Sequence, residues 1–420
     1  MPQPVARINL ERLKTLLEGV NGFGCNPDTG GYSRPGFSKA DMDCRAWFAA
    51  RMQQDDLAVR TDGALNIFGR FGPGDGPCIL AGSHLDTVVD GGAYDGALGA
   101  CVALECVLAM KEAGITPGIA IEVVATSEEE GRFGGMLGAQ AMTGMVTPEW
   151  IAGAKDADGT YLMQAMQEQG LDPAAILDAA REPGSVAAFL ELHIEQGPVL
   201  EQERLPIGIA DRISGVCYLE LSFSGVANHS GTTPMNLRAD AFAGLADLAH
   251  AVPGLIADLG TGQSRITIGH VTLTPNHPHT IPGKAVFSVI IRDTSEDVMR
   301  TLRETFLRQA ERAAKAHGLG IECTERSWLP PVRLDADLAD RLENLAREHG
   351  LPARRMPSGA GHDAQTMQAF CPSGLIFVPS RNGISHAPEE HSDWQDIEQG
   401  ANLMLQALVD LSGGSTKKLT

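Results

Sequence analysis

The sequence has few aromatic residues and few basic residues for a chain of 420. Phe, Trp and Tyr make up 5% of it, and 33 Lys and Arg stand against 53 Asp and Glu, which leaves a net charge of -20. Such a surface repels phosphate backbones and anionic lipids, and it offers few rings on which bases stack. We therefore expect neither nucleic acid nor a membrane surface as a partner.

The chain also lacks a C-x-x-C pair, a secretory signal and any run of eighteen uninterrupted apolar residues. Eight scattered cysteines are typical of buried free thiols in a reducing cytoplasm rather than of a disulfide framework. The N-terminus leads into a polar helical pattern without the charged-then-apolar order of a signal peptide. No phosphate loop, dinucleotide fingerprint or G-x-S-x-G motif is present. These absences predict a cytoplasmic protein without a membrane span that is neither a nucleotide enzyme nor a serine hydrolase.

The first half of the chain alternates short apolar runs with helical patterns, which predicts an α/β domain with a mixed sheet and helices on both faces. The same pattern returns after the proline pair at 330–331. We expect a frayed tail at 413–420. The predicted strands are 78–83, 119–126, 188–194 and 374–378, and the predicted helices are 99–113, 336–349 and 397–411.

Residues 212–328 have a different rhythm, with a β-α-β-β-α-β order typical of a compact two-layer α+β domain. We predict that this segment is inserted into a discontinuous catalytic domain formed by 1–211 and 329–420. The expected strands of the insert are 216–224, 265–274, 285–293 and 320–326, and its expected helices are 237–251 and 298–317.

Ionisable residues follow three of the predicted strands, at the sheet edge where open α/β folds bind ligands. His84 and Asp86 follow the first strand, three glutamates follow the second at 128–130, and His193 ends the third. Taken alone, His-x-Asp is more typical of a loop cap, and the glutamates equally fit a solvated acidic loop. Together with Asp95 and His386, they form a His and carboxylate set without thiolate, which favours a hydrolytic divalent site over structural zinc.

These motifs together resemble one family over essentially the whole chain. The order of motifs is similar to that of the hydantoinase/carbamoylase amidases, part of a dinuclear metallopeptidase superfamily that includes allantoate amidohydrolases and β-ureidopropionases. The motifs that carry the resemblance are G-S-H-L-D at 82–86, D-G at 95–96, E-E-G-R-F at 129–133, H-I-E-Q-G at 193–197, N-H-S-G at 228–231, R-D at 292–293 and G-I-S-H at 383–386.

The resemblance implies two divalent metal ions per subunit, Zn²⁺ or alternatively Mn²⁺, Co²⁺ or Ni²⁺. Asp95 would bridge them, His84 and His193 would complete one site, and Glu130 and His386 would complete the other. Ligand chemistry does not distinguish among these metals, because they compete for the same donors.

The resemblance also implies catalytic roles. Asp86 would stand behind His84, and Glu129 would take a proton from the attacking water and return it to the leaving nitrogen. His229 would stabilise the developing oxyanion, often in the partner subunit's site. No role follows for Glu128 or His362, and the run of three glutamates leaves a register ambiguity of one position.

Substrate binding is implied for four residues, each with a plainer alternative. Arg292 would grip a substrate carboxylate through its forked donors, or form a surface ion pair. Asn276 and Gln196 would hydrogen-bond the ureido group and carboxylate, or serve only as turn residues. His229 would contact the substrate as well, whereas a lone loop histidine is more often solvated.

The predicted function is a dinuclear-metal amidohydrolase that cleaves the N-carbamoyl C–N bond of a small carboxylate, foremost an N-carbamoyl-L-amino acid, to amino acid, CO2 and NH3. The alternatives are an allantoate amidohydrolase, an N-carbamoyl-β-alanine hydrolase and a non-catalytic metal- or carboxylate-binding homologue. The resemblance further implies a homodimer formed through the inserted lid domain.

Overall fold

The computed structural model describes residues 6–416, and the chain divides there into two compact units. The first unit comprises 1–211 and 333–420, and the second comprises 212–332. The chain passes from the first unit to the second within strand β7 (Ile207–Ile213) and returns at β12 (Val332–Arg333).

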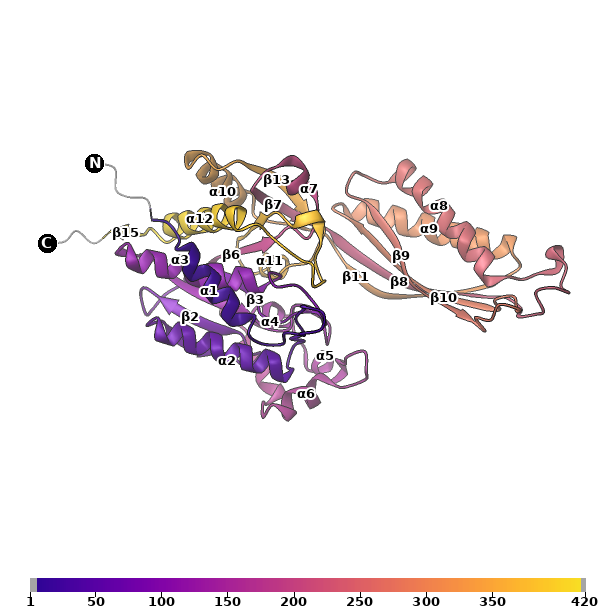
Figure 1. The fold of residues 1–420 in the computed structure, drawn as a ribbon, viewed down its shortest axis with the longest axis horizontal. Helices are drawn as coiled ribbons and strands as arrows, with labels where there is room; N and C mark the ends of the chain where they lie inside the picture. Colours follow the sequence, from indigo (N-terminus) through magenta and orange to yellow (C-terminus); the bar gives the residue numbers. More distant parts are fainter. Residues whose placement is uncertain (1–5, 417–420) are drawn as a thin grey trace. The chain divides into compact units, whose positions relative to one another are not determined.

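The first unit is built on a nine-stranded mixed sheet (Figure 1). Its centre consists of four parallel strands in the order β5, β3, β6, β14, so the segments predicted at 119–126, 78–83 and 188–194 are neighbours. Antiparallel strands flank this centre on both sides. The bounds are β1 (Ala58–Thr61), β2 (Ile67–Phe71), β3 (Cys78–His84), β5 (Ala120–Thr126), β6 (Val186–Ile194), β13 (Ala353–Ser358) and β14 (Ser373–Val378).

One apolar core lies between this sheet and its longer helices, and a second cluster packs around shorter helices. Helix α3 is apolar apart from Glu105 and its last two residues, and it is buried along almost its whole length, as expected of a helix at the centre of a large core. The larger core includes α1 (Leu10–Val20), α2 (Lys39–Gln54), α3 (Ala97–Glu112), α10 (Ala336–Glu348) and α12 (Trp394–Leu411); the remaining helices are α4 (Leu137–Met142), α5 (Pro148–Gly153), α6 (Leu162–Glu168), α7 (Val199–Glu203) and α11 (Asp363–Met367).

The second unit has a four-stranded antiparallel sheet in the order β11, β8, β10, β9, with two helices packed against it. Its β-α-β-β-α-β order agrees with the predicted α+β fold, and the mixed α/β class of the whole chain is confirmed. The bounds are β8 (Gly215–Ser224), α8 (Ala241–Leu259), β9 (Arg265–Thr274), β10 (Lys284–Asp293), α9 (Glu296–Ala316) and β11 (Gly320–Leu329).

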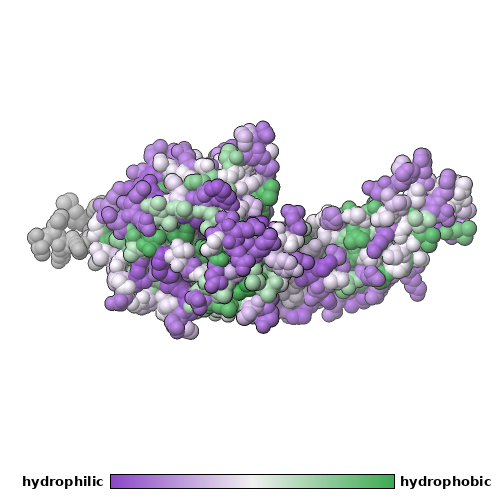
Figure 2. Space-filling model, turned by 90° about the horizontal axis from the view of Figure 1, so that it is seen from below, coloured by the Kyte–Doolittle hydropathy of each residue, from purple (hydrophilic) through white to green (hydrophobic). Residues whose placement is uncertain are grey.

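Helix α8 leaves much apolar surface uncovered. It is the one helix among residues 6–416 that is long and apolar enough to cross a membrane by length and composition alone, and 17% of that window is buried. The helix contains no run of eighteen uninterrupted apolar residues, because Asp247, His250 and Asp258 interrupt it. Hydrophobic residues also reach the surface of this unit in Figure 2.

Two residues of the predicted frayed tail form a strand instead. Ser415 and Thr416 form a short strand, β15, which pairs with β4 (Ile115–Thr116), so backbone pairing holds these two residues. Residues 417–420 of the predicted tail lie outside the described part of the chain.

Candidate metal centre and substrate-binding residues

Two histidines from adjacent parallel strands begin the site. His84 ends β3 and His193 lies near the end of β6, and both are buried. Nδ1 of His84 lies 2.9 Å from the carbonyl oxygen of Asp86, and Nδ1 of His193 lies 2.9 Å from that of Ile194. Because a carbonyl only accepts, each Nδ1 carries a hydrogen, so in the neutral ring each Nε2 has the electron pair that a metal ion would take.

Asp95 lies at the centre of the site and faces histidines with both of its oxygens. Its Oδ1 is 3.1 Å from Nε2 of His193 and 3.5 Å from Nε2 of His84, whereas its Oδ2 is 3.2 Å from Nε2 of His386. Gly96 permits this approach, because its φ is +61° and an added Cβ would lie 2.3 Å from the His84 ring. The carboxylate is therefore placed to bridge two sites.

Glu130 and His386 form the other side of the site. Oε2 of Glu130 lies 3.4 Å from Nε2 of His386, and Oε1 of Glu130 is buried without a hydrogen-bond partner among the described residues. Burial and the neighbouring Asp95 raise the pKa of Glu130 to about 7. The hydrogen bond to Asp95 raises the pKa of His386 to about 9. A buried carboxylate oxygen without a hydrogen-bond partner destabilises the folded protein unless a cation binds to it.

The electrostatics of the cluster point the same way. Burial would lower the pKa of His84, but Glu129 and Asp95 raise it well above its usual value. Burial would raise the pKa of Asp95, but hydrogen bonds from His193, His386 and His84 hold it well below the usual range. Protons therefore lie between the histidines and carboxylates of this cluster, and a divalent cation bound there would displace those protons.

The predicted metal ligands thus fall into two groups of three, each with ligand atoms within 4.8 Å of one another. One group is His84, Asp95 and His193, and the other is Asp95, Glu130 and His386. The donors are imidazole nitrogens and carboxylate oxygens, the set that catalytic divalent ions accept.

Asp86 lies behind His84 and contacts its ring through the backbone. Its backbone carbonyl, not its carboxylate, takes the His84 ring hydrogen, and the carboxylate lies 3.8 Å from that ring nitrogen. The carboxylate oxygens instead accept hydrogen bonds from the backbone nitrogens of Glu129 (3.3 Å) and Glu130 (3.1 Å). Asp86 therefore holds the turn that presents these two glutamates.

The structure gives the three adjacent glutamates different surroundings. Glu129 places Oε2 3.6 Å from Nε2 of His84, and burial together with Glu130 raises its pKa well above the usual value. Glu128 points away, and its carboxylate accepts hydrogen bonds from the backbone nitrogens of Phe133 (2.6 Å) and Gly135 (3.3 Å). Burial raises the pKa of Glu128 to about 8. Glu128 therefore stabilises the loop that follows it through hydrogen bonds to the loop backbone.

Asp95 is positioned by Glu390, which the sequence did not single out, and by Gln196, which it did. Oε1 of Glu390 accepts from the backbone nitrogens of Tyr94 (2.9 Å) and Asp95 (3.0 Å), and its Oε2 accepts from the Ser385 hydroxyl. The amide of Gln196 donates to Oδ2 of Asp95 at 2.7 Å. Gln196 thus borders the candidate metal centre.

A second polar layer lies behind His193. Its ring meets that of His362 edge to face at 4.6 Å, and Glu191 accepts from the Ser83 hydroxyl at 2.7 Å. Burial, then the nearby His193, lowers the pKa of His362 well below its usual value. His362 is buried, so it belongs to the wall of the site. Glu191 precedes His193 by two residues on the same strand face, which was the available sequence signal.

The second unit fixes the orientation of His229. Its Nδ1 accepts hydrogen bonds from the backbone nitrogens of Gly231 (3.0 Å) and Thr232 (3.2 Å). The neutral ring therefore carries its hydrogen on Nε2, which makes it a donor toward solvent. His229 pairs with Thr280 in the turn that also contains Asn276, and both predicted residues are exposed.

Arg292 lies at the opposite end of the same sheet. On β10, Lys284 pairs with Ser224 and Arg292 pairs with Val216, eight residues farther along. This spans about 26 Å at the usual rise of a strand. His229 lies beyond Ser224, and the pairing continues in that direction, away from Arg292. One copy of this unit therefore does not bring His229 and Arg292 together.

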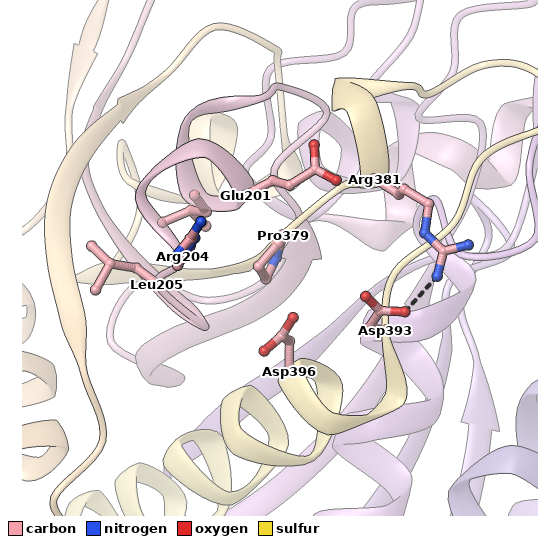
Figure 3. A pocket seen from close by; sticks show the side chains of 8 residues that line it. Glu201, Arg204, Leu205, Pro379, Arg381, Asp393 and Asp396 are labelled. Carbon is pink, nitrogen blue, oxygen red and sulfur yellow. Dashed lines mark hydrogen bonds and ion pairs between the residues drawn. The ribbon is translucent and has the colours of Figure 1, made fainter.

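A separate cavity of about 210 Å³ lies by α7 and the start of α12 (Figure 3). Its charged side chains include Glu201, Arg204 and Asp396, and an ion pair joins Arg381 to Asp393 at 2.6 Å. None of its lining residues is a predicted site residue.

The parallel sheet with histidines and carboxylates at its strand ends, beside a glutamate that can accept a proton, defines the class of metal-dependent hydrolases. The chain belongs to the peptidase family M20/M25/M40, which matches residues 80–410. This confirms the family resemblance and the prediction of a hydrolase acting on non-peptide C–N bonds.

Similar proteins match almost the full length. The N-carbamoyl-L-amino acid amidohydrolase of Geobacillus stearothermophilus is 36% identical, covering 96% of this chain and 99% of the relative. The allantoate amidohydrolase of Bacillus subtilis is 33% identical, covering 94% and 96%. A solved hydantoinase/carbamoylase family amidase of Burkholderia multivorans is 30% identical with a TM-score of 0.87, covering 97% of this chain and 98% of the other.

Proposed function

We propose that this protein is a dinuclear-metal amidohydrolase that cleaves the N-carbamoyl C–N bond of a small carboxylate, foremost an N-carbamoyl-L-amino acid. The observation that carries the proposal is the placement of Asp95, whose two oxygens face two different groups of candidate ligands. The similar carbamoyl amino acid amidohydrolases support this substrate class.

His84, Asp95 and His193 would hold one ion, and Asp95, Glu130 and His386 would hold the other. Zn²⁺, Mn²⁺, Co²⁺ and Ni²⁺ all suit these donors. Two bound ions would polarise the ureido carbonyl and lower the pKa of the attacking water.

The reaction then follows from the residues around the centre. Glu129 takes a proton from the attacking water as the oxygen–carbon bond forms, and it delivers that proton to the substrate nitrogen as the C–N bond breaks. The amino acid leaves, and the remaining carbamate yields CO2 and NH3. The Nε2 hydrogen of His229 stabilises the negative oxygen of the intermediate.

Substrate recognition falls to Gln196 and to the inserted unit. Arg292 binds the carboxylate through its forked donors, and Asn276 and Gln196 hydrogen-bond the polar groups of the substrate. Burial lowers the pKa of Arg292 below its usual value, and this partial desolvation strengthens an ion pair formed there.

Arg292→Lys tests the carboxylate contact. Lysine keeps the charge but loses the paired donors, so we expect KM to rise about 10- to 100-fold, the loss of one charged hydrogen bond, with a smaller change in kcat. Steady-state kinetics measure both. Arg265→Lys is the matched control, because Arg265 pairs with Arg292 across β9 and β10 and is exposed. An unchanged KM for Arg292→Lys would remove Arg292 from the binding site.

A substrate panel tests the function itself. The metal-free protein, reloaded in turn with Zn²⁺, Mn²⁺, Co²⁺ or Ni²⁺, is assayed for ammonia release from N-carbamoyl-L-amino acids, their D-forms, N-carbamoyl-β-alanine and allantoate. We expect the highest kcat/KM with an N-carbamoyl-L-amino acid and loss of activity after chelation. Preference for allantoate or N-carbamoyl-β-alanine would select that alternative, and a metal-loaded protein inactive on all of them would refute the proposal.

We also propose a cytoplasmic homodimer that forms through the inserted unit. All eight cysteines are free, and six of them are buried, as in a reducing compartment. Strand β9 is a sheet edge whose residues are largely exposed, and Phe242 on α8 is 50% exposed. An open edge next to an apolar helix is a surface on which a second copy could extend the sheet.

A further inference from the structure

A buried arginine lies beneath the loop that carries the catalytic glutamates. We call residues 127–135 the acid loop. Arg45 comes from α2 and is 3% exposed. Its Nη2 donates to the carbonyl of Thr126 at 2.7 Å, and its Nη1 donates to that of Leu65 at 3.2 Å. Thr126 is the last residue of β5, so Arg45 grips the strand where the acid loop begins.

Asp86 connects this arginine to the glutamates. Nη2 of Arg45 lies 3.8 Å from Oδ1 of Asp86, and the Asp86 carboxylate accepts the backbone nitrogens of Glu129 and Glu130. The contacts therefore run from the guanidinium through one carboxylate to the two residues that act as base and ligand.

The guanidinium itself is held in one orientation. Its Nε donates to Oδ1 of Asp41 at 2.8 Å, and Oδ2 of Asp41 accepts from the backbone nitrogen of Phe37. The adjacent Gly36 packs against Glu128, where an added Cβ would lie 2.6 Å from the Glu128 side chain. The segment before α2 and the acid loop are therefore packed as one piece.

Arg45 lies next to a crowded group of buried carboxylates. Asp86, Glu128, Glu129, Glu130 and Asp363 are buried or nearly so within one region, and crowded carboxylates repel one another. Arg45 is a permanent cation in contact with this group, and its planar fork fixes direction as well as charge.

We propose that Arg45 is a positioning residue that sets the acid loop through Asp86, so that Glu129 and Glu130 face the metal centre. The proposal rests on the proposed function. Arg45 lies on α2, outside the motifs that supply the candidate metal ligands, so the proposal gives this helix a role in the reaction.

The test compares Arg45→Lys with Arg51→Lys. Both arginines lie on α2 and both pair with an aspartate four residues away, but Arg51 pairs with Asp55 and has no contact with the acid loop. Metal-free proteins are titrated with Co²⁺ and followed by the absorption spectrum of the bound ion. We expect Arg45→Lys to bind Co²⁺ about 10- to 100-fold more weakly, as when a group that orients a ligand is lost. Its kcat should fall more than its KM changes, and Arg51→Lys should match the unmodified protein.

A second variant separates positioning from general destabilisation. Asp86→Asn keeps the shape of the side chain but loses its charge, so it should weaken Co²⁺ binding with Arg45 in place. The variant with both substitutions should bind Co²⁺ no less tightly than the single variant with the lower affinity, because both residues act through the same series of contacts. Additive losses, or a normal Co²⁺ affinity and kcat in Arg45→Lys, would overturn the proposal. The Co²⁺ titration needs no substrate, so it stays informative even if ureido compounds are not hydrolysed.

Discussion

Glu129→Gln should abolish most turnover while leaving metal binding close to that of the unmodified protein. Glu129 is outside both groups of candidate ligands, yet its carboxylate lies 3.6 Å from the His84 nitrogen that faces Asp95. Burial and Glu130 raise its pKa well above the usual value, which makes its carboxylate a strong proton acceptor. Glutamine keeps the shape and cannot accept the proton, so we expect kcat to fall about 10²- to 10⁴-fold.

Measurement of kcat alongside bound metal per chain checks this result, and the neighbouring glutamates supply the controls. Glu130→Gln should lose metal, because Glu130 belongs to a ligand group. Glu128→Gln should keep most activity, since the carboxyl only accepts backbone hydrogen bonds and burial raises its pKa to about 8. The three variants thereby resolve the register of the three glutamates. An active, metal-loaded Glu129→Gln protein would end the assignment of Glu129 as the base.

The sequence allowed the centre of the fold and the ligand cluster to be predicted, because both depend on local pattern. Three apolar runs end in ionisable residues, and parallel strands bring such ends to one edge. The short flanking strands gave no comparable signal. β1 has four residues, and Gly69 and Arg70 interrupt the apolar pattern of β2.

The supporting contacts could not be predicted, because their partners are distant in the chain or belong to the backbone. Glu390 binds backbone nitrogens almost 300 residues earlier, and Asp86 acts through the peptide groups of Glu129 and Glu130. Charged Asp41 and Arg45 lie on the buried face of α2, so they cancel the apolar stripe that marks a core helix. Patterns of residue type contain no information about such contacts.

The separation of His229 from Arg292 has the larger consequence for assembly. The two lie at opposite ends of one sheet, about 26 Å or more apart by the rise of β10, whereas an N-carbamoyl amino acid is far shorter. If both residues contact one substrate, they must come from different copies of the chain. Two inactive variants of different residues should then restore activity when their subunits exchange.

We expect Glu129→Gln and His229→Ala proteins, each nearly inactive, to regain activity when they are mixed under conditions that allow subunits to exchange. Random exchange makes half of the dimers mixed, and each mixed dimer contains one site with Glu129 and the partner's His229 both intact, so activity should reach about a quarter of the unmodified value. Pairing Glu129→Gln with Arg292→Ala is the matched control, because Arg292 would then lie on the same chain as Glu129 and no activity should return. If activity returns only in the control mixture, Arg292 comes from the partner chain and His229 from the same chain as Glu129. If neither mixture recovers, although mass spectrometry shows mixed dimers, His229 and Arg292 do not share a substrate, and the two-chain site is wrong.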